Sequence, residues 1–298
     1  MKIAHISDLH VNLDIRDTNL PETEAALDFI LDKGVDHIVL TGDLADNGEL
    51  EALETLREMF RRRDLLDRDR LTVVIGNHDI FGGVQNIEEI FDFPEKCRAV
   101  DFEEKVRAFH RMFIETYEGA EYARDDNPYP FAKRVGDVLF VAFNTVARYS
   151  STGNPFASNG VIDDDQRELA AALLERFGGE ADTRIVLTHH HFKKMKVVSR
   201  RWMQLMWENV ENRTMKMRKR KKAARMFKER GVDFVMHGHV HDSEIYKWKE
   251  LDISNAGASI KNGKSDTLRV NILDLAKKEI DASIEKISFK KQRKKLSA

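Results

Sequence analysis

The sequence predicts an α/β fold with parallel neighbouring strands. In the first 80 residues, short apolar runs at 2–7, 36–41 and 71–75 alternate with amphipathic stretches at 21–33 and 48–63. Such alternation is typical of strands joined by helical crossovers of right-handed sense. A further observation is that a polar cluster follows each of these strands directly, at the position where open α/β sheets bind their ligands.

The remainder of the chain continues this pattern with two expected insertions. We interpret residues 81–130 as an insertion that covers one side of the site and contains a helix at 102–117. A hairpin is expected from strands 131–135 and 138–144, followed by a helix at 163–177 with an acidic N-terminus and strands at 184–188 and 233–236. Three antiparallel strands are expected at 244–248, 268–275 and 279–287. Because no repeat or Gly/Ser linker interrupts the chain, we predict a single domain over 1–298, with insertions at about 81–130 and 193–230.

Composition excludes several classes of protein. The chain has 298 residues with 49 Lys plus Arg against 51 Asp plus Glu, so net charge predicts no overall attraction to nucleic acid or membranes. The single cysteine, Cys97, excludes an intramolecular disulfide and is typical of a reducing compartment. No apolar run approaches the roughly 20 residues of a membrane-spanning helix, and the start is too polar for a signal peptide. We expect a cytoplasmic location, and peripheral attachment to a membrane is left open.

Seven residues placed after strands are candidate metal ligands. Taken alone, each short cluster is usually an ordinary turn or loop, but their joint occurrence after successive strands indicates a metal site. Carboxylate, amide and imidazole donors together suit borderline cations such as Mn, Fe or Zn, and no thiolate lies near them. The sequence therefore predicts a centre for divalent or trivalent metal ions, held by Asp8, His10, Asp43, Asn77, His189, His239 and His241.

The same motifs resemble the calcineurin-like metallophosphoesterase family. The resemblance runs through Asp8-Leu9-His10, Gly42-Asp43-Leu44-Ala45-Asp46, Gly76-Asn77-His78-Asp79, Thr188-His189-His190 and Gly238-His239-Val240-His241. It implies a four-layer α/β/β/α sandwich of two mixed sheets, with the active site at the C-terminal ends of the strands. It also implies that Asp43 bridges two metals, with Asp8, His10 and His241 completing one site and Asn77, His189 and His239 the other.

One ligand position has two candidates, because three consecutive histidines follow the strand at 184–188. The family register favours His189, but His190 would take its place if the strand ended one residue later. Otherwise His190 is a candidate substrate contact. We expect His191 to lie in a loop that faces solvent or substrate.

These residues predict phosphoester hydrolysis. Two cations roughly 3.5–4 Å apart lower the pKa of a bridging water, so we expect in-line attack of metal-bound hydroxide on phosphorus. The family resemblance implies that His78 contacts the phosphate and protonates the leaving oxygen, with Asp79 or Asp46 orienting its ring. Asn144 and Arg148, in a polar loop after a strand, are further candidate substrate contacts.

The substrate itself is less constrained. We favour a phosphodiester, as in class III cyclic-nucleotide phosphodiesterases; the alternative is a lipid pyrophosphatase of the UDP-diacylglucosamine type. Residues 193–225 carry many Lys and Arg with interleaved Trp and Met, and could form a membrane-facing cap, an anionic membrane contact or a helix packed on the domain. A non-catalytic scaffold is disfavoured because every ligand position holds a competent residue. A phosphorylated substrate is expected as partner and nucleic acid is not; the oligomeric state is left open.

Overall fold

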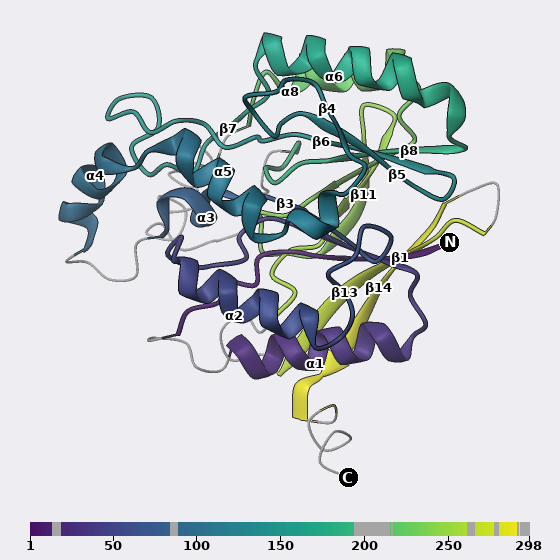
Figure 1. Ribbon diagram of the computed structural model, residues 1–298, viewed down its shortest axis with the longest axis horizontal. Coiled ribbons are helices and arrows are strands. Elements are labelled where there is room, and N and C mark those ends of the chain that lie inside the picture. The colour runs from purple at the N-terminus through teal and green to yellow at the C-terminus, as the bar shows by residue number, and fades with distance from the viewer. Residues whose placement is uncertain are drawn as a thin grey trace, which may run out of the picture.

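The α/β prediction is confirmed in the computed structural model, in which two mixed sheets stack face to face between layers of helices (Figure 1). The helices α1 and α2 lie outside one sheet, and α6 and α8 lie outside the other. The structure describes residues 1–13, 19–83, 89–193, 215, 217–260, 266–276, 280–290 and 292.

The first sheet has the strand order β14-β13-β1-β2-β3. Its parallel half consists of β1 (Lys2–Ile6), β2 (His37–Thr41) and β3 (Leu71–Val74), joined through α1 (Asn19–Asp32) and α2 (Leu50–Arg61). The long hairpin of β13 (Thr267–Asp274) and β14 (Asp281–Ser288) extends this half in the antiparallel sense. Because β1, β2 and β3 run the same way, the loops that follow them lie at one edge of the sheet.

The second sheet has the order β11-β12-β10-β8-β6-β5-β4. Its parallel centre is formed by β6 (Val138–Ala142), β8 (Thr183–Leu187), β10 (Phe234–His237) and β12 (Leu251–Asn255). Antiparallel strands flank it: β11 (Glu244–Trp248) on one side, β5 (Phe131–Val135) and the short β4 (Glu121–Tyr122) on the other. The strand β12 was not anticipated from the sequence.

The outer helices pack through apolar faces, as their sequence periodicity predicts. In α2, Leu53, Leu56 and Phe60 are buried while Arg61 and Glu51 face outward. The helix α6 (Asp164–Phe177) begins at Asp163, whose side chain accepts a hydrogen bond from the backbone of Gln166. The basic helix α8 (Arg220–Glu229) buries Ala223, Ala224, Met226 and Phe227 against the second sheet and α6.

The short helix α3 (Asn77–Phe81) ends where the insertion at 81–130 begins, and the insertion contains α4 (Glu89–Ala99) and α5 (Phe102–Met112). The predicted helix at 102–117 was too long: α5 ends at Met112, and a 3-10 turn, η1 (Ile114–Tyr117), follows. The break occurs at Phe113, whose φ of −120° departs from helical geometry while its ring is buried against Phe60 and Phe109. Tertiary packing therefore overrides the apolar periodicity here.

Part of the basic segment at 193–225 lies outside the described residues, namely 194–214 and 216. Where the described chain resumes, β9 (Met217–Arg218) pairs in parallel with β7 (Gly160–Val161), a small sheet that the sequence did not predict. The helices in the described part of the chain are all too short or too polar to cross a membrane. The interpretation of the whole chain as one domain stays a prediction.

Candidate metal centre

The seven candidate ligands converge where five strands end. Each follows a strand of a parallel ladder, so the topology brings residues from positions 8 to 241 to one edge of the sandwich. The contributing strands and residues are β1 with Asp8 and His10, β2 with Asp43, β3 with Asn77, β8 with His189, and β10 with His239 and His241.

Four of these residues have left-handed backbone conformations. Asp8, His10, Asp43 and His239 have φ values of 54°, 44°, 53° and 71°. Non-glycine residues adopt this region rarely, and functional sites are where such strain is commonly retained. Hydrogen bonds between adjacent loops hold these backbone conformations in place. The backbone N–H of Asp8 donates to the carbonyl oxygen of Gly42, and that of His10 donates to the carbonyl oxygen of Asp43, both at 3.0 Å.

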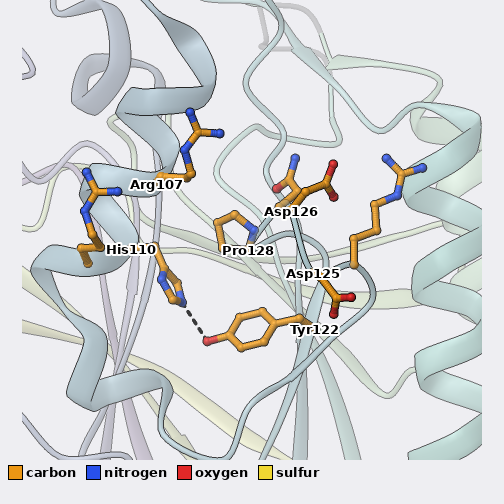
Figure 2. Close-up of a pocket in the computed structure, with 9 residues that line it drawn as sticks. Arg107, His110, Tyr122, Asp125, Asp126 and Pro128 are labelled. Carbon is orange, nitrogen blue, oxygen red and sulfur yellow. Dashed lines mark hydrogen bonds between the residues drawn. The ribbon is translucent and has the colours of Figure 1, made fainter.

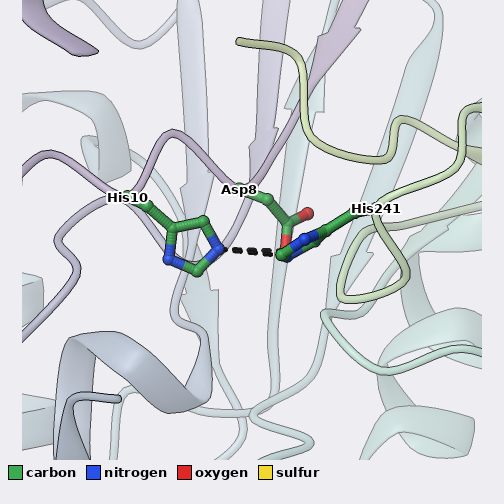
Figure 3. Close-up of side chains that lie close together, drawn as sticks. All are labelled: Asp8, His10 and His241. Carbon is green, nitrogen blue, oxygen red and sulfur yellow. Dashed lines mark hydrogen bonds and ion pairs between the residues drawn. The ribbon is translucent and has the colours of Figure 1, made fainter. Parts of the chain in front are cut away.

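Asp8, His10 and His241 form the first group of donor atoms (Figure 3). The Nε2 atoms of His10 and His241 are 3.2 Å apart, and they lie 3.9 and 3.7 Å from Oδ1 of Asp8. Asp8 and His10 are buried, whereas the side chain of His241 is 45% exposed. The group therefore opens to solvent on the side of His241.

Asp43, Asn77, His189 and His239 form the second group. Nε2 of His189 lies 3.2 Å from Oδ2 of Asp43, 3.1 Å from Oδ1 of Asn77 and 3.2 Å from Nδ1 of His239. Oδ2 of Asp43 is also 3.9 Å from Nε2 of His10, in the first group. Asp43 is thus the carboxylate that lies between both groups.

Glycine is required where the strand-end loops approach most closely. A Cβ atom at Gly76 would overlap the carboxylate and backbone nitrogen of Asp43, and one at Gly238 would overlap Ser7 and the carboxylate of Asp8. These two positions let separate loops bring their ligands together, because any larger residue would push the loops apart.

The donor set fits two cations. Burial raises the pKa of Asp8 to about 6, which shows the cost of holding this carboxylate without a compensating charge. Burial also raises the pKa of Asp43, but the neighbouring His189, His78 and His10 outweigh it and bring the pKa well below its ordinary value. Two buried carboxylates, an amide oxygen and several imidazoles are the donors that divalent metals of the Mn, Fe and Zn type accept.

A model of the calcineurin-like phosphoesterases matches residues 1–243, most of the chain. The chain belongs to the calcineurin-like phosphoesterase family. This confirms the resemblance drawn from the motifs, and the two mixed sheets agree with the sandwich that the resemblance implied. Members of the family typically bind two metal ions and act on phosphorylated substrates, in agreement with the two groups of donor atoms.

Solved structures of similar fold include phosphatases. A dimetal phosphatase from Danio rerio has a TM-score of 0.58 at 11% identity, over 97% of this chain and 99% of that chain. Purple acid phosphatase PPD1 from yellow lupin seeds has a TM-score of 0.57 at 11% identity, over 97% of this chain but 52% of that chain. GAP50, the anchor in the inner membrane complex of Plasmodium, has a TM-score of 0.50 at 14% identity, over 98% of this chain and 85% of that chain. No protein with a curated description matches by sequence.

The three consecutive histidines of this phosphoesterase face different partners. His189 directs Nδ1 at the carbonyl oxygen of Thr41, 2.7 Å away, so its Nε2 lone pair faces Asp43 and Asn77. His190 instead directs Nδ1 at the hydroxyl of Thr145, 2.9 Å away, and its ring packs against Gly160. The geometry favours His189 as the ligand. His191 was expected to face solvent or substrate, and solvent is wrong: its ring is buried and stacks on His239 with centroids 5.8 Å apart.

His78 lies beside the first group and contacts Asp46. Its Nδ1 is 2.8 Å from the backbone oxygen of Asp46 and 3.4 Å from the carboxylate Oδ1. The same Oδ1 lies 3.3 Å from Nδ1 of His10, so one carboxylate contacts two imidazoles. Asp79 makes different contacts: its oxygens accept from the backbone N–H of Leu44, Ala45 and Gly76 at 2.8–2.9 Å. Of the two residues considered for orienting His78, the geometry therefore favours Asp46.

The candidate substrate contacts lie on a neighbouring loop. Asn144 is buried, and its Oδ1 accepts from the backbone N–H of Val146, a contact that shapes the loop. Arg148 is exposed, forms an ion pair with Glu103 and lies over the ring of Phe102 at 4.7 Å. Both side chains are therefore held by neighbouring protein groups.

Two contributors were missed by the sequence reasoning. The carbonyl of Thr41 fixes the ring of His189, and the hydroxyl of Thr145 fixes that of His190. Thr41 is the last residue of β2, and a backbone carbonyl gives no signal in a sequence. Thr145 follows Asn144 directly, so a hydroxyl beside a candidate contact was the available signal.

Proposed function

We propose that the chain is a dinuclear metal-dependent phosphodiesterase. The observation that carries the proposal is the position of Asp43, whose Oδ2 lies 3.2 Å from His189 and 3.9 Å from His10, between the two groups of donors. One cation would be held by Asp8, His10, His241 and Asp43, and the other by Asp43, Asn77, His189 and His239. When bound, the two metals supply an activated water and neutralise the charge of the phosphate.

His78 is proposed to protonate the leaving oxygen. Burial lowers the pKa of His78, but the carboxylates of Asp43 and Asp46 outweigh it and bring the pKa to about 9, so the ring is cationic at neutral pH. Because Nδ1 is turned toward Asp46, Nε2 is the atom that can contact a phosphate oxygen and release a proton. Asp46 holds this orientation.

A substrate panel with added Mn tests the proposal. We expect bis-p-nitrophenyl phosphate or cyclic AMP to be hydrolysed at least tenfold faster, by kcat/KM, than the monoester p-nitrophenyl phosphate. Asp43→Asn should abolish turnover and reduce bound metal measured by elemental analysis. His78→Ala should lower kcat by about 10²–10⁴-fold with metal content unchanged, because a general acid contributes on that scale. Preference for the monoester, or equal metal loss in both variants, would contradict the proposal.

The alternative substrate is a lipid pyrophosphate of the UDP-diacylglucosamine type, with residues 193–225 as a membrane-facing cap. It is supported by the place where the basic segment returns to the described chain: Met217 pairs with Gly160, and Gly160 packs on His190 at the site. UDP-diacylglucosamine therefore belongs in the panel. Co-sedimentation with anionic vesicles separately tests membrane contact, and full activity without vesicle binding would leave the segment as ordinary surface.

The expected cytoplasmic location rests on the single cysteine, Cys97, which is buried as a free thiol. A catalytic role is also supported against the non-catalytic scaffold, because every ligand position is filled and all seven side chains converge.

A further inference from the structure

A second polar pocket lies between α5 and the loop that joins β4 to β5 (Figure 2). Its volume is about 370 Å³, and none of its lining residues belongs to the candidate metal centre. Arg107 and His110 reach it from α5, and Asp125 and Asp126 lie on the loop opposite. The full lining is Arg107, His110, Arg111, Tyr122, Arg124, Asp125, Asp126, Asn127 and Pro128.

Charges of opposite sign are held apart in this pocket. Arg107 and Arg111 share one carboxylate outside it, that of Glu104, at 3.2 and 2.5 Å. Arg124 likewise forms an ion pair with a residue outside the pocket, Asp165 of α6, at 2.5 Å. Within the described part of the chain, Asp125 and Asp126 form no ion pair. Two arginines that share a single carboxylate keep several N–H donors and one positive charge for another anion.

The floor of the pocket is built of fixed aromatic side chains. The ring of His110 stacks on the buried Tyr117 at 4.4 Å, and its Nε2 is 2.7 Å from the hydroxyl of Tyr122. This hydrogen bond fixes Tyr122, a residue that is 37% exposed and borders the pocket beside Pro128. A planar ring can stack there without reorganisation of the wall.

We propose that this pocket binds a nucleoside monophosphate. Arg107 and Arg111, one helical turn apart on α5, present guanidinium groups to the phosphate, which they can bind bidentately. Asp125 and Asp126 accept hydrogen bonds from the hydroxyl or amino groups at the other end of the ligand, and the base packs on Tyr122. The volume of 370 Å³ lies at the lower end of ligand pockets and suits one nucleotide better than a polymer.

Calorimetry with a non-hydrolysable phosphonate analogue of AMP tests this proposal independently of the metal centre. The full chain is titrated with the analogue, with adenosine and with inorganic phosphate, both loaded with Mn and after treatment with a chelator. We expect one binding event to survive metal removal, at least tenfold tighter for the analogue than for either fragment. Loss of all binding on chelation would overturn the proposal, as would equal affinity for inorganic phosphate or for adenosine.

A pair of matched variants assigns the binding event to the pocket. Arg107→Gln/Arg111→Gln should lower the affinity for the analogue at least tenfold, because both phosphate-binding groups are removed. The control is Arg61→Gln/Arg62→Gln at the C-terminal end of α2, since these exposed arginines also share one carboxylate, that of Glu58. In this control variant, the affinity for the analogue should change less than twofold.

A loop variant provides a second test that leaves α5 intact. Asp125→Asn/Asp126→Asn should reduce the preference for the analogue over inorganic phosphate at least fivefold. Neither pocket variant should change turnover of bis-p-nitrophenyl phosphate by more than twofold, so failure of this proposal is distinguishable from failure of the proposed function. Unchanged affinity for the analogue in the Arg107→Gln/Arg111→Gln variant would refute the site.

Discussion

The carboxylate of Asp46 offers a direct test of how this phosphoesterase controls its proposed acid. Its Oδ1 lies 3.4 Å from Nδ1 of His78 and 3.3 Å from Nδ1 of His10. Asp46→Asn keeps the size of the side chain and removes its charge. The backbone oxygen that also contacts His78 remains, so the ring keeps one of its two partners. The variant therefore isolates the electrostatic role of Asp46.

The expected magnitude follows from the pKa of His78. A pKa of about 9 against 6.5 corresponds to about 3 kcal/mol in favour of the charged ring, at about 1.4 kcal/mol for each pH unit. Asp43 and Asp46 provide this together, so loss of the Asp46 charge should lower the pKa by roughly one unit. A raised pKa stabilises the folded chain below pH 6.5, and this contribution disappears as pH rises through about 9.

The assay is the pH dependence of kcat for bis-p-nitrophenyl phosphate at saturating Mn. Because an acid works only while protonated, the fall in rate at high pH should begin about one pH unit lower in Asp46→Asn than in the unaltered protein. The affinity for metal should also fall by about 10–100-fold, since the carboxylate of Asp46 contacts His10, which is itself a candidate ligand.

The control is Asp79→Asn, because Asp79 contacts backbone N–H groups and not the ring of His78. Asp79→Asn should destabilise the fold by about 1–3 kcal/mol, because it weakens buried hydrogen bonds. It should not change the pH at which kcat falls on the alkaline side. If the pH at which kcat falls is unchanged in Asp46→Asn, or is lowered equally in Asp79→Asn, this account of His78 is refuted.

Three further perturbations test other parts of the structure. Gly76→Ala should prevent normal metal loading, measured by elemental analysis, because its Cβ would overlap Asp43; retained metal would show that the loops can separate. Burial lowers the pKa of Lys133 to about 7, so the free energy of unfolding should rise by about 4 kcal/mol between pH 7 and 10, at about 1.4 kcal/mol for each pH unit. Lys133→Met should flatten this rise in urea denaturation curves, and parallel curves for the two proteins would mean that the amine stays charged beside its three acceptors. Removal of metal by a chelator should lower the Tm, because Asp8 and Asp43 lose their compensating charge; an unchanged Tm would count against metal binding.

Much of the fold could be predicted because the signals are local. Apolar runs such as 36–41 and 71–75 became strands with nearly the expected bounds, and the expected helices ended within five residues of their predicted bounds, although α4 was not expected. The errors occur where distant contacts decide. The helix at 102–117 ended early because Phe113 packs on Phe60, and β12 formed because β10 offered it a parallel edge. Neither partner is adjacent in sequence.

For the site, the sequence alone determined which donor types are present and that each follows a strand. This is enough to indicate a metal centre of a phosphoesterase, because the C-terminal ends of parallel strands must meet at one edge. Only the tertiary structure gives grounds to favour His189 over His190 and Asp46 over Asp79, since these choices depend on which atom each ring or carboxylate faces. The carbonyl that orients His189 belongs to Thr41, 148 residues away, and such a contact exists only once the two sheets are stacked.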